Sequence, residues 1–295
     1  KRWIAALGAM LVAVPLSAGE TPANAIDEAS GLAASRAHAG VFWTHNDGPN
    51  PRLVGDREPD PRLYALDAEG RLKGTVELPI DNQDWEDLAA FRWQGEDWLL
   101  VADTGNNDRS RKHGLLHLFP EPSPDQGEVS AERVRSIRFR FPDAVHDCEA
   151  VAVDPASNTI LLVTKRSQPP VIYRLDLDVA GDDAVARRVG ELTTLPPVDW
   201  VKIVQHPLLG LYAAQPTAMD ISPDGRRVVI STYDDAHVYT RGPDQDWAEA
   251  FAARPQVLEQ PGIAQYEGVA FGPDGQSIFV IAEGEEPPPL ELDFH

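Results

Sequence analysis

The chain has 295 residues, 42% of them hydrophobic, and its 47 Asp and Glu against 26 Lys and Arg give a net charge of −21. A chain of this size can bury a large core, and all-β folds often use such a length for one domain. The acidic excess argues against binding to nucleic acid or to an anionic membrane, and it is compatible with plain solvation or with cation binding.

The first segment of the chain, residues 1–25, predicts a signal peptide. Two basic residues precede the apolar run WIAALGAMLVAVPLSA, and small residues suited to cleavage follow at Ala18 and Ala25. The run is short for a transmembrane helix, with an uncleaved N-terminal anchor as the alternative. We therefore expect a periplasmic or secreted protein, free of the membrane after cleavage, with one mature domain over residues 26–295.

Five stretches of one pattern follow along the chain, each with a polar residue, a small or acidic residue, a large aliphatic residue, then Ala or Asp. They are SGLAAS from Ser30, EDLAAF from Glu86, EAVAVD from Glu149, TAMDIS from Thr217 and EGVAFG from Glu267. A turn follows each stretch, and then a β-forming run such as WLLVAD or SIFVIAE. Asp- and Gly-containing turns between apolar runs predict β-hairpins.

A third strand is expected in each unit, and a fourth in several of them. Third strands begin near Arg62, Leu115, Val171, His237 and Leu290, and fourth strands begin near Leu72, Val134 and Val185. Each unit is then a four-stranded antiparallel meander, which cannot bury both faces alone. Radial packing of such units predicts an all-β fold, a β-propeller with five blades, or with six as the alternative. Residues around Ile26 could supply the fourth strand of the last blade.

Two segments depart from this pattern. Residues 193–215 predict an insertion over one face, long enough to hide the degenerate strands of a sixth blade. Residues 246–255, DWAEAFAARP, fit either a short helix or a distorted outer strand.

In such a propeller, the first strand of each unit lines the central channel and its opening residue lies at one mouth. The opening residues are Ser30, Glu86, Glu149, Thr217 and Glu267. The residues just before them add Glu28, Asp84, Asp147 and Gln265. The second strands end at the same mouth with His45, Asp47, Asp103, Lys165, Tyr233 and Glu283. We therefore expect an acidic face around the axis of the channel.

So many carboxylates at short range cannot all stay ionised, so either some hold a proton or a cation lies among them. Oxygen ligands without thiolates favour Ca²⁺ or Mg²⁺, and a loose array of carboxylates suits Ca²⁺ better. His45 or His146 would shift the preference toward Zn²⁺ or Mn²⁺. The single cysteine, Cys148, excludes a Cys-based zinc site and is expected to be a small buried hydrophobe.

A structural role for these residues is the alternative, with each Glu accepting backbone N–H bonds or pairing with a nearby Lys or Arg. Lys165 and Arg166 are the only cations at the ends of the second strands. They would either anchor an anionic group of a substrate or neutralise Glu149. The sequence holds no Gly-x-Ser-x-Gly elbow, His-Glu-x-x-His motif, Walker-type loop or Gly-x-Gly-x-x-Gly motif.

The motifs EASGLAAS, FWTHNDG, DWEDLAAF, LLVADTGNN, DCEAVAV and YEGVAF resemble a group of secreted bacterial β-propeller proteins described as esterase-like or phytase-like, and the resemblance covers residues 28–292. It implies a propeller with an acidic, Ca²⁺-binding face, since propeller phytases use clustered Ca²⁺ to bind phosphate and activate water. It further implies a phosphate contact at Lys165 and metal ligands at Asp47, Asp84, Glu86, Asp103, Glu149 and Glu267. The chain departs from the expected pattern at Asn106 and Asn107, and at Ser30 and Thr217, where acids are missing.

Two functions follow as predictions. The first is an exported, monomeric propeller whose Ca²⁺-binding face holds a small molecule or a protein ligand without catalysis, and Glu283 is added to the ligands named above. The second is a metal-dependent hydrolase of phosphoesters, esters or lactones, in which Glu86, Glu149 and Glu267 hold the metal. In that case His45 or Asp103 would be the general base and Lys165 would position the substrate.

Overall fold

The computed structural model describes most of the chain, namely residues 25–48, 60–180, 183–195, 204, 212–262, 265–284 and 287–294. The predicted signal peptide lies outside these residues except for Ala25, as does most of the predicted insertion at 193–215. Within the described residues, no helix has the length and apolar content needed to cross a membrane.

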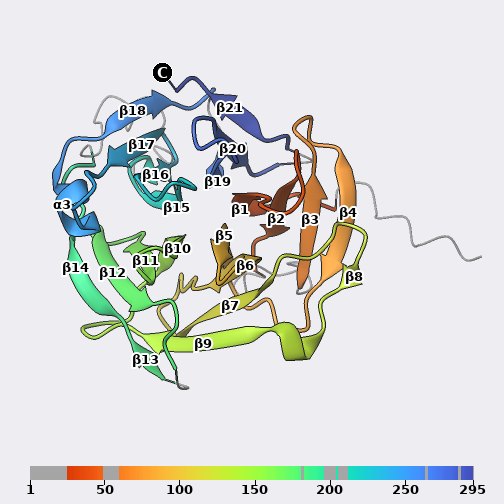
Figure 1. The fold of residues 1–295 in the computed structure, drawn as a ribbon. Coiled ribbons are helices and arrows are strands. Elements are labelled where there is room, and N and C mark those ends of the chain that lie inside the picture. Colours follow the sequence, from red (N-terminus) through yellow and green to blue (C-terminus); the bar gives the residue numbers. More distant parts are fainter. Residues whose placement is uncertain are drawn as a thin grey trace, which may run out of the picture.

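Five small sheets form a ring around a central channel, so the predicted five-bladed β-propeller is confirmed (Figure 1). The first blade holds β1 (Ala29–Ala34), β2 (Phe42–Asn46), β3 (Arg62–Leu66) and β4 (Leu72–Glu77). The second holds β5 (Trp85–Trp93), β6 (Glu96–Asp103), β7 (Gly114–Pro120) and β9 (Arg135–Arg140). The third holds β10 (Cys148–Asp154), β11 (Thr159–Thr164), β12 (Val171–Asp176) and β14 (Arg187–Glu191). The fourth holds β15 (Pro216–Ile221), β16 (Arg227–Thr232), β17 (Asp235–Thr240) and β18 (Gln256–Glu259), and the fifth holds β19 (Tyr266–Phe271), β20 (Ile278–Ala282) and β21 (Leu290–Leu292).

Two short strands tie neighbouring blades together. β8 (Gly127–Glu128) follows β7 of the second blade but pairs in parallel with β4 of the first. β13 (Ala184–Val185) follows β12 of the third blade but pairs in parallel with β9 of the second. A 3₁₀ turn at Ala131–Arg133 leads into β9. The connecting segments therefore add backbone hydrogen bonds between blades, which a plain meander would lack.

The fifth blade has three strands in the described part of the chain, and the segment around Ile26 does not add the fourth. Ile26 instead packs under β1 in a buried cluster that includes Leu32 and Phe42 of the first blade with Ala270 and Ile281 of the fifth. The amide of Gly284 also donates to the carbonyl of Asp27 at 3.1 Å. This segment therefore joins the first and fifth blades through side-chain packing and one backbone hydrogen bond, without pairing along β21.

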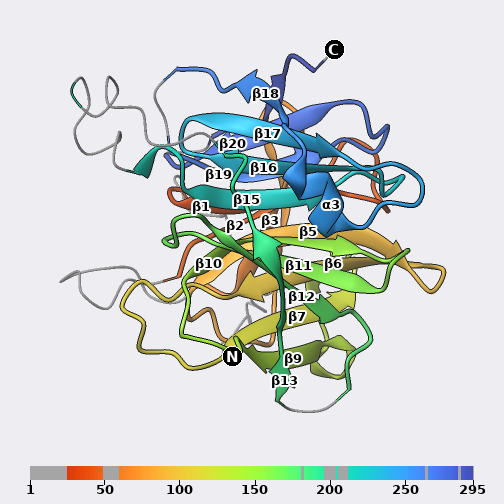
Figure 2. The ribbon, with the colours of Figure 1, turned by 90° about the vertical axis from the view of Figure 1, so that its left-hand side faces the viewer.

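The hydrophobic core consists of five clusters, one between each pair of neighbouring blades. Cys148 belongs to the cluster between the second and third blades, as expected of a buried hydrophobe. The ambiguous segment near residue 246 forms the helix α3 (Trp247–Ala252), which lies at the outer rim between the third and fourth blades (Figure 2). Its N-cap Asp246 and Glu249 form a capping box, which satisfies the first free amides of the helix.

Candidate metal site at the channel mouth

A β-bulge lies at the start of every inner strand. The pairing register shifts between Trp85 and Asp87 in β5, and equivalent shifts occur near the start of β1, β10, β15 and β19. The residues at or beside these shifts are Ser30, Glu86, Glu149, Thr217 and Glu267. A bulge re-aims a side chain that would otherwise follow the strict alternation of a strand. The repeated motif therefore encodes a repeated bulge, which presents one side chain per blade at the channel mouth.

The two hydroxyl members of this column join neighbouring blades. Ser30 donates its hydroxyl to the carbonyl of Glu86 at 2.7 Å, and Thr217 donates to the carbonyl of Tyr266 at 2.7 Å. These two positions carry a hydroxyl instead of an acid, and each hydroxyl binds a carbonyl of the inner strand of the next blade. The acidic members Glu86, Glu149 and Glu267 are left to give the mouth its charge.

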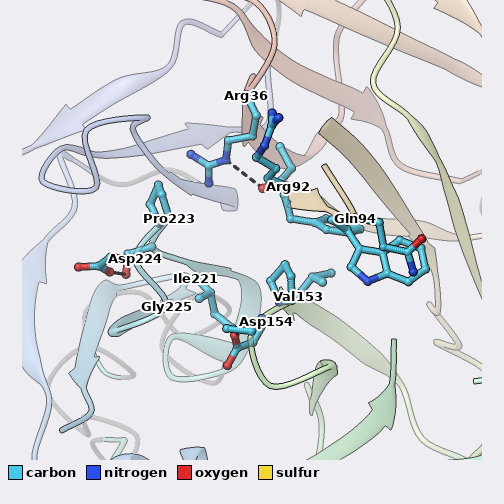
Figure 3. A pocket seen from close by; sticks show the side chains of 15 residues that line it. Arg36, Arg92, Gln94, Val153, Asp154, Ile221, Pro223, Asp224 and Gly225 are labelled. Carbon is cyan, nitrogen blue, oxygen red and sulfur yellow. Dashed lines mark hydrogen bonds between the residues drawn. The ribbon is translucent and has the colours of Figure 1, made fainter. Parts of the chain in front are cut away.

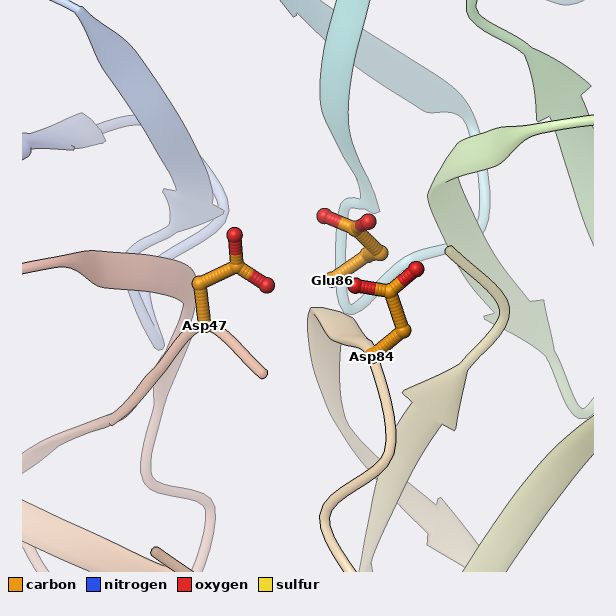
Figure 4. A group of neighbouring side chains, drawn as sticks. All are labelled: Asp47, Asp84 and Glu86. Carbon is orange, nitrogen blue, oxygen red and sulfur yellow. The ribbon is translucent and has the colours of Figure 1, made fainter. Parts of the chain in front are cut away.

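Three carboxylates from two blades meet at this mouth. Asp47 follows β2, Asp84 precedes β5 and Glu86 lies within β5, and their side chains point toward one another (Figure 4). One oxygen of each lies within 4.8 Å of the other two. A second group of the same size, Glu86 with Asp147 and Glu149, shares Glu86. The structure therefore brings together four of the predicted ligands, and it adds Asp147, which stood at the predicted face but outside the predicted ligand set.

Basic side chains neutralise the acids around this trio. Arg111 lies 2.7 Å from the buried carboxylate of Asp103, and Arg166 lies 2.6 Å from that of Asp147. Lys165 forms a buried ion pair with Glu149. The contact with Lys165 fits the structural alternative for Glu149, and the role of Asp103 and Glu149 as metal ligands stays a prediction.

The trio itself has no such direct ion pair. Among the described residues, no basic side chain forms an ion pair with Asp47, Asp84 or Glu86. Glu86 is only 2% exposed, and its Oε1 is buried without a hydrogen-bond partner. Gly105 makes room for it, since a Cβ there would lie 2.1 Å from that oxygen and 2.4 Å from Cγ of Asp84. The site thus holds an unsatisfied carboxylate oxygen in a space that only a glycine leaves open.

Proximity and burial raise the pKa of each member of the trio. Burial and the charge of Asp147 raise the pKa of Asp84 to about 7. Burial, with Glu149, Asp47 and Asp84 nearby, raises the pKa of Glu86 well above its usual range. Burial and the charge of Asp84 do the same for the pKa of Asp47. Three such groups favour either a bound proton or a bound cation.

The opposite side of the mouth carries a chain of hydrogen bonds. Lys165, which is 8% exposed, donates to the hydroxyl of Tyr233 at 2.8 Å, and Tyr233 donates to Glu267 at 2.5 Å. Glu283 accepts from the side chain of Gln265 at 2.7 Å, and burial with the nearby Glu267 raises its pKa to about 8. Glu267 and Glu283 thus lie at the predicted mouth, outside both carboxylate groups that could hold a metal.

The two histidines considered as nitrogen ligands lie in different surroundings. His45 is fully buried, its Nδ1 bonds to the carbonyl of Asn46 at 3.0 Å, and burial lowers its pKa to about 4. Its ring meets that of Trp85 edge to face. His146 contacts Asp143 and Tyr173, at 3.2 Å and 3.0 Å. Neither ring belongs to the carboxylate groups, and the role of His45 as a general base stays a prediction.

Asp87 is a further buried carboxylate, and the sequence did not indicate its structural role. Its Oδ2 accepts from the amides of Val151 at 2.8 Å and Met219 at 3.0 Å, and its Oδ1 accepts from that of Leu88 at 2.8 Å. Asp87 therefore links the inner strands of three blades across the channel. Asp220 has a similar role for the amides of Ile221 and Phe271. The sequence signal for this role was an acidic residue inside an apolar stretch, namely Asp87 in EDLAAF and Asp220 in TAMDIS.

Comparison with known proteins adds little to this geometry. No family model matches the chain, and no curated protein matches it. Among solved structures, a chain of "Crystal Structure of Mitotic Checkpoint Complex" matches at a TM-score of 0.38 and 13% identity, over 89% of this chain and 62% of that chain. The match thus spans less than two thirds of that chain, and a likeness of this strength carries no argument about function.

The raised pKa values predict how the protein responds to pH in the absence of metal. The pKa values of Asp84, Glu149 and Glu283 rise to about 7, 8 and 8, from ordinary values of 3.8 and 4.5, with burial as the largest cause. The native state then holds protons that the unfolded state releases, so the stability from these groups is full below about pH 4 and is lost progressively as the pH rises to about 8.

Urea unfolding in EDTA at several pH values between 6.5 and 9 measures this effect, because buried histidines such as His45, with a pKa lowered to about 4, favour unfolding only below that range. The midpoint should fall with rising pH, and Asp84→Asn should flatten part of that decline. A midpoint that climbs steadily over the same range would contradict the raised pKa values.

Proposed function

We propose that this protein is an exported propeller that binds a divalent cation at the acidic mouth of its channel and uses that face to bind a small ligand. The observation that carries the proposal is the trio of Asp47, Asp84 and Glu86. Its carboxylates converge without a basic partner among the described residues, and a buried oxygen of Glu86 has no hydrogen-bond partner. A bound cation would satisfy that oxygen and remove the repulsion. The predicted signal peptide supports export.

The ligand chemistry of the trio fits Ca²⁺. All three side chains offer oxygen, which hard cations prefer, and two oxygens that bind one Ca²⁺ at about 2.4 Å lie at most about 4.8 Å apart. The oxygens of the trio meet that limit, since they lie within 4.8 Å of one another. Asp147 and Glu149 extend the carboxylate array beside Glu86. Carbonyl groups and water would complete the six to eight oxygens that Ca²⁺ takes.

A second candidate is a hydrolase of phosphoesters, esters or lactones, as the phytase-like resemblance implies. The hydrogen-bond chain from Lys165 through Tyr233 to Glu267 favours it, because it places a cation and a hydroxyl beside the second carboxylate group. A bound metal ion supplies polarisation of a substrate oxygen and a lowered pKa of water. His45 and Asp103 are fully buried, so neither is well placed to take a proton from a bound water.

Calcium titration by calorimetry tests the cation site directly. Protein freed of metal with EDTA should bind Ca²⁺ with heat, and Glu86→Gln or Asp84→Asn should weaken the affinity roughly tenfold or more, because each removes one charged ligand. Glu96→Gln is the matched control, since Glu96 is exposed and pairs only with Arg133 at the surface. Equal affinities in all four proteins would reject the trio as the site.

Hydrolysis assays then separate the two candidates. Turnover of p-nitrophenyl phosphate, p-nitrophenyl acetate or a lactone that needs Ca²⁺ and stops in EDTA would establish the hydrolase. Calcium binding without turnover favours the binding protein. Absence of both would reject each candidate.

A further inference from the structure

The other mouth of the channel holds a separate cavity. The inner strands run away from the acidic face, so β5 leads from Glu86 to Trp93 and β10 leads from Glu149 to Asp154. Residues at the far ends of β5, β10 and β15, together with Arg36 after β1, line a cavity of about 410 Å³ (Figure 3). Four blades therefore contribute to it. Pockets for small ligands have volumes of about 300–1,000 Å³, so the cavity is of ligand size.

Most charged groups in this cavity already have partners. Asp154 accepts from the indole of Trp247 at 2.9 Å and lies 2.7 Å from Arg241. Arg92, at the rim, pairs with Asp97 at 2.9 Å. Asp224 accepts from the hydroxyl of Ser222 at 2.6 Å and from a backbone amide at 3.0 Å. Asp154 and Arg92 are therefore neutralised by an opposite charge, and Asp224 accepts two hydrogen bonds.

Arg36 differs from these groups. Its Nε donates to the carbonyl of Ala90 at 3.1 Å, while its Nη1 is buried without a hydrogen-bond partner. The charge of Arg36 lowers the pKa of Asp220, which burial otherwise raises, without an ion pair between the two side chains. The Asp220 oxygens accept from the amides of Ile221 and Phe271. No acid of the described chain forms an ion pair with Arg36 within 4.0 Å, so its guanidinium is the unsatisfied charge of this cavity.

Apolar groups make up the rest of the wall. Arg36 extends over one side of the cavity, and Ile221 and Val153 lie across from it, with Pro223 beside them (Figure 3). One guanidinium can balance one negative charge, and the net charge of −21 disfavours a dianion such as phosphate. A guanidinium also pairs well with the planar oxygens of a carboxylate.

We propose that this cavity binds a small monocarboxylate with an apolar body, whose carboxylate pairs with Arg36 and whose body packs against Ile221 and Val153. The site is independent of the cation at the opposite mouth. The propeller would thus have two binding sites on one axis, one for a metal ion and one for an organic anion.

Ligand-observed NMR and calorimetry with 3-phenylpropionate and octanoate test the proposal, with the corresponding neutral amides as matched probes. The carboxylates should bind roughly 10- to 100-fold more tightly than the amides, because hydrogen bonds to a charged group contribute about 1.5–3 kcal/mol. Arg36→Gln should remove this preference, and Arg92→Gln should leave it intact because Arg92 is already paired. EDTA and Asp84→Asn should change nothing.

A second variant covers the possibility that Arg36→Gln does not fold. Ala156 is an exposed residue of the same cavity wall, so Ala156→Trp should block binding while Arg36 remains. Equal binding of acids and amides, equal loss in the Arg36 and Arg92 variants, loss in EDTA, or no binding of either carboxylate would each overturn the proposal.

Discussion

Replacing Asp87 with Ala should lower the free energy of unfolding by roughly 3 kcal/mol or more, because each buried N–H that loses its acceptor costs about 1–3 kcal/mol. Asp87 accepts from three backbone amides, those of Leu88, Val151 and Met219. These amides belong to the inner strands of three different blades. Loss of the carboxylate therefore removes contacts between blades at the point where they lie closest to the axis.

Urea unfolding in EDTA gives the measurement, since it excludes any loss of metal from the comparison. Asp87→Asn retains one acceptor oxygen and should cost less than Asp87→Ala. Glu96→Ala, at an exposed pair with Arg133, should stay within about 0.5 kcal/mol of the unmodified protein. If Asp87→Ala unfolded at the same urea concentration as Glu96→Ala, the blades would not depend on this carboxylate.

The blade number could be predicted because each inner strand repeats one polarity pattern. Glu86, Glu149 and Glu267 occupy equivalent positions in that pattern, and the structure places all three at bulges at the channel mouth. A pattern of polar and apolar residues reports the face of a strand and its place in the unit. That information is enough to locate the acidic face.

The division of that face into paired and unpaired acids could not be predicted. Asp103 and Asp147 look like Asp84 in the sequence, but Arg111 and Arg166 neutralise the first two. The pairing depends on where a loop returns a side chain in three dimensions, which residue type and spacing do not report. The same limit hid the use of Asp87 as an acceptor, because its partners Val151 and Met219 lie 64 and 132 residues away.

The segment at 246–255 carries a local signal that decides between a helix and a strand. Asp246 and Glu249 stand at the spacing of a capping box, which favours a helix over a distorted strand. The segment around Ile26 has no such local signal. An apolar residue there can contact the fifth blade either by side-chain packing or as part of a paired strand. Sequence pattern alone does not separate those two kinds of contact.

At pH 9, where Glu149 is ionised because its pKa is about 8, replacing Lys165 with Met should destabilise the protein by about 3–5 kcal/mol, because removal of one partner of a buried ion pair leaves the other charge uncompensated. The side chains of Lys165 and Glu149 are 9% and 3% exposed. Lys165 is also the donor to Tyr233, which in turn holds Glu267. The double variant with Glu149→Gln should recover much of the loss, since it removes the stranded charge.

The pH dependence of the stability of the Lys165→Met protein distinguishes a charge effect from a packing effect. Lys165 lowers the pKa of Glu149, which burial otherwise raises, to the net value of about 8. Without Lys165 that pKa rises further, so Glu149 of the Lys165→Met protein takes up a proton when the pH falls. The cost of Lys165→Met, measured by urea unfolding in EDTA, should therefore be smaller at pH 5.5 than at pH 9. A cost that is the same at both values, with no recovery in the double variant, would mean that Lys165 contributes by packing against Tyr233 and not by its charge.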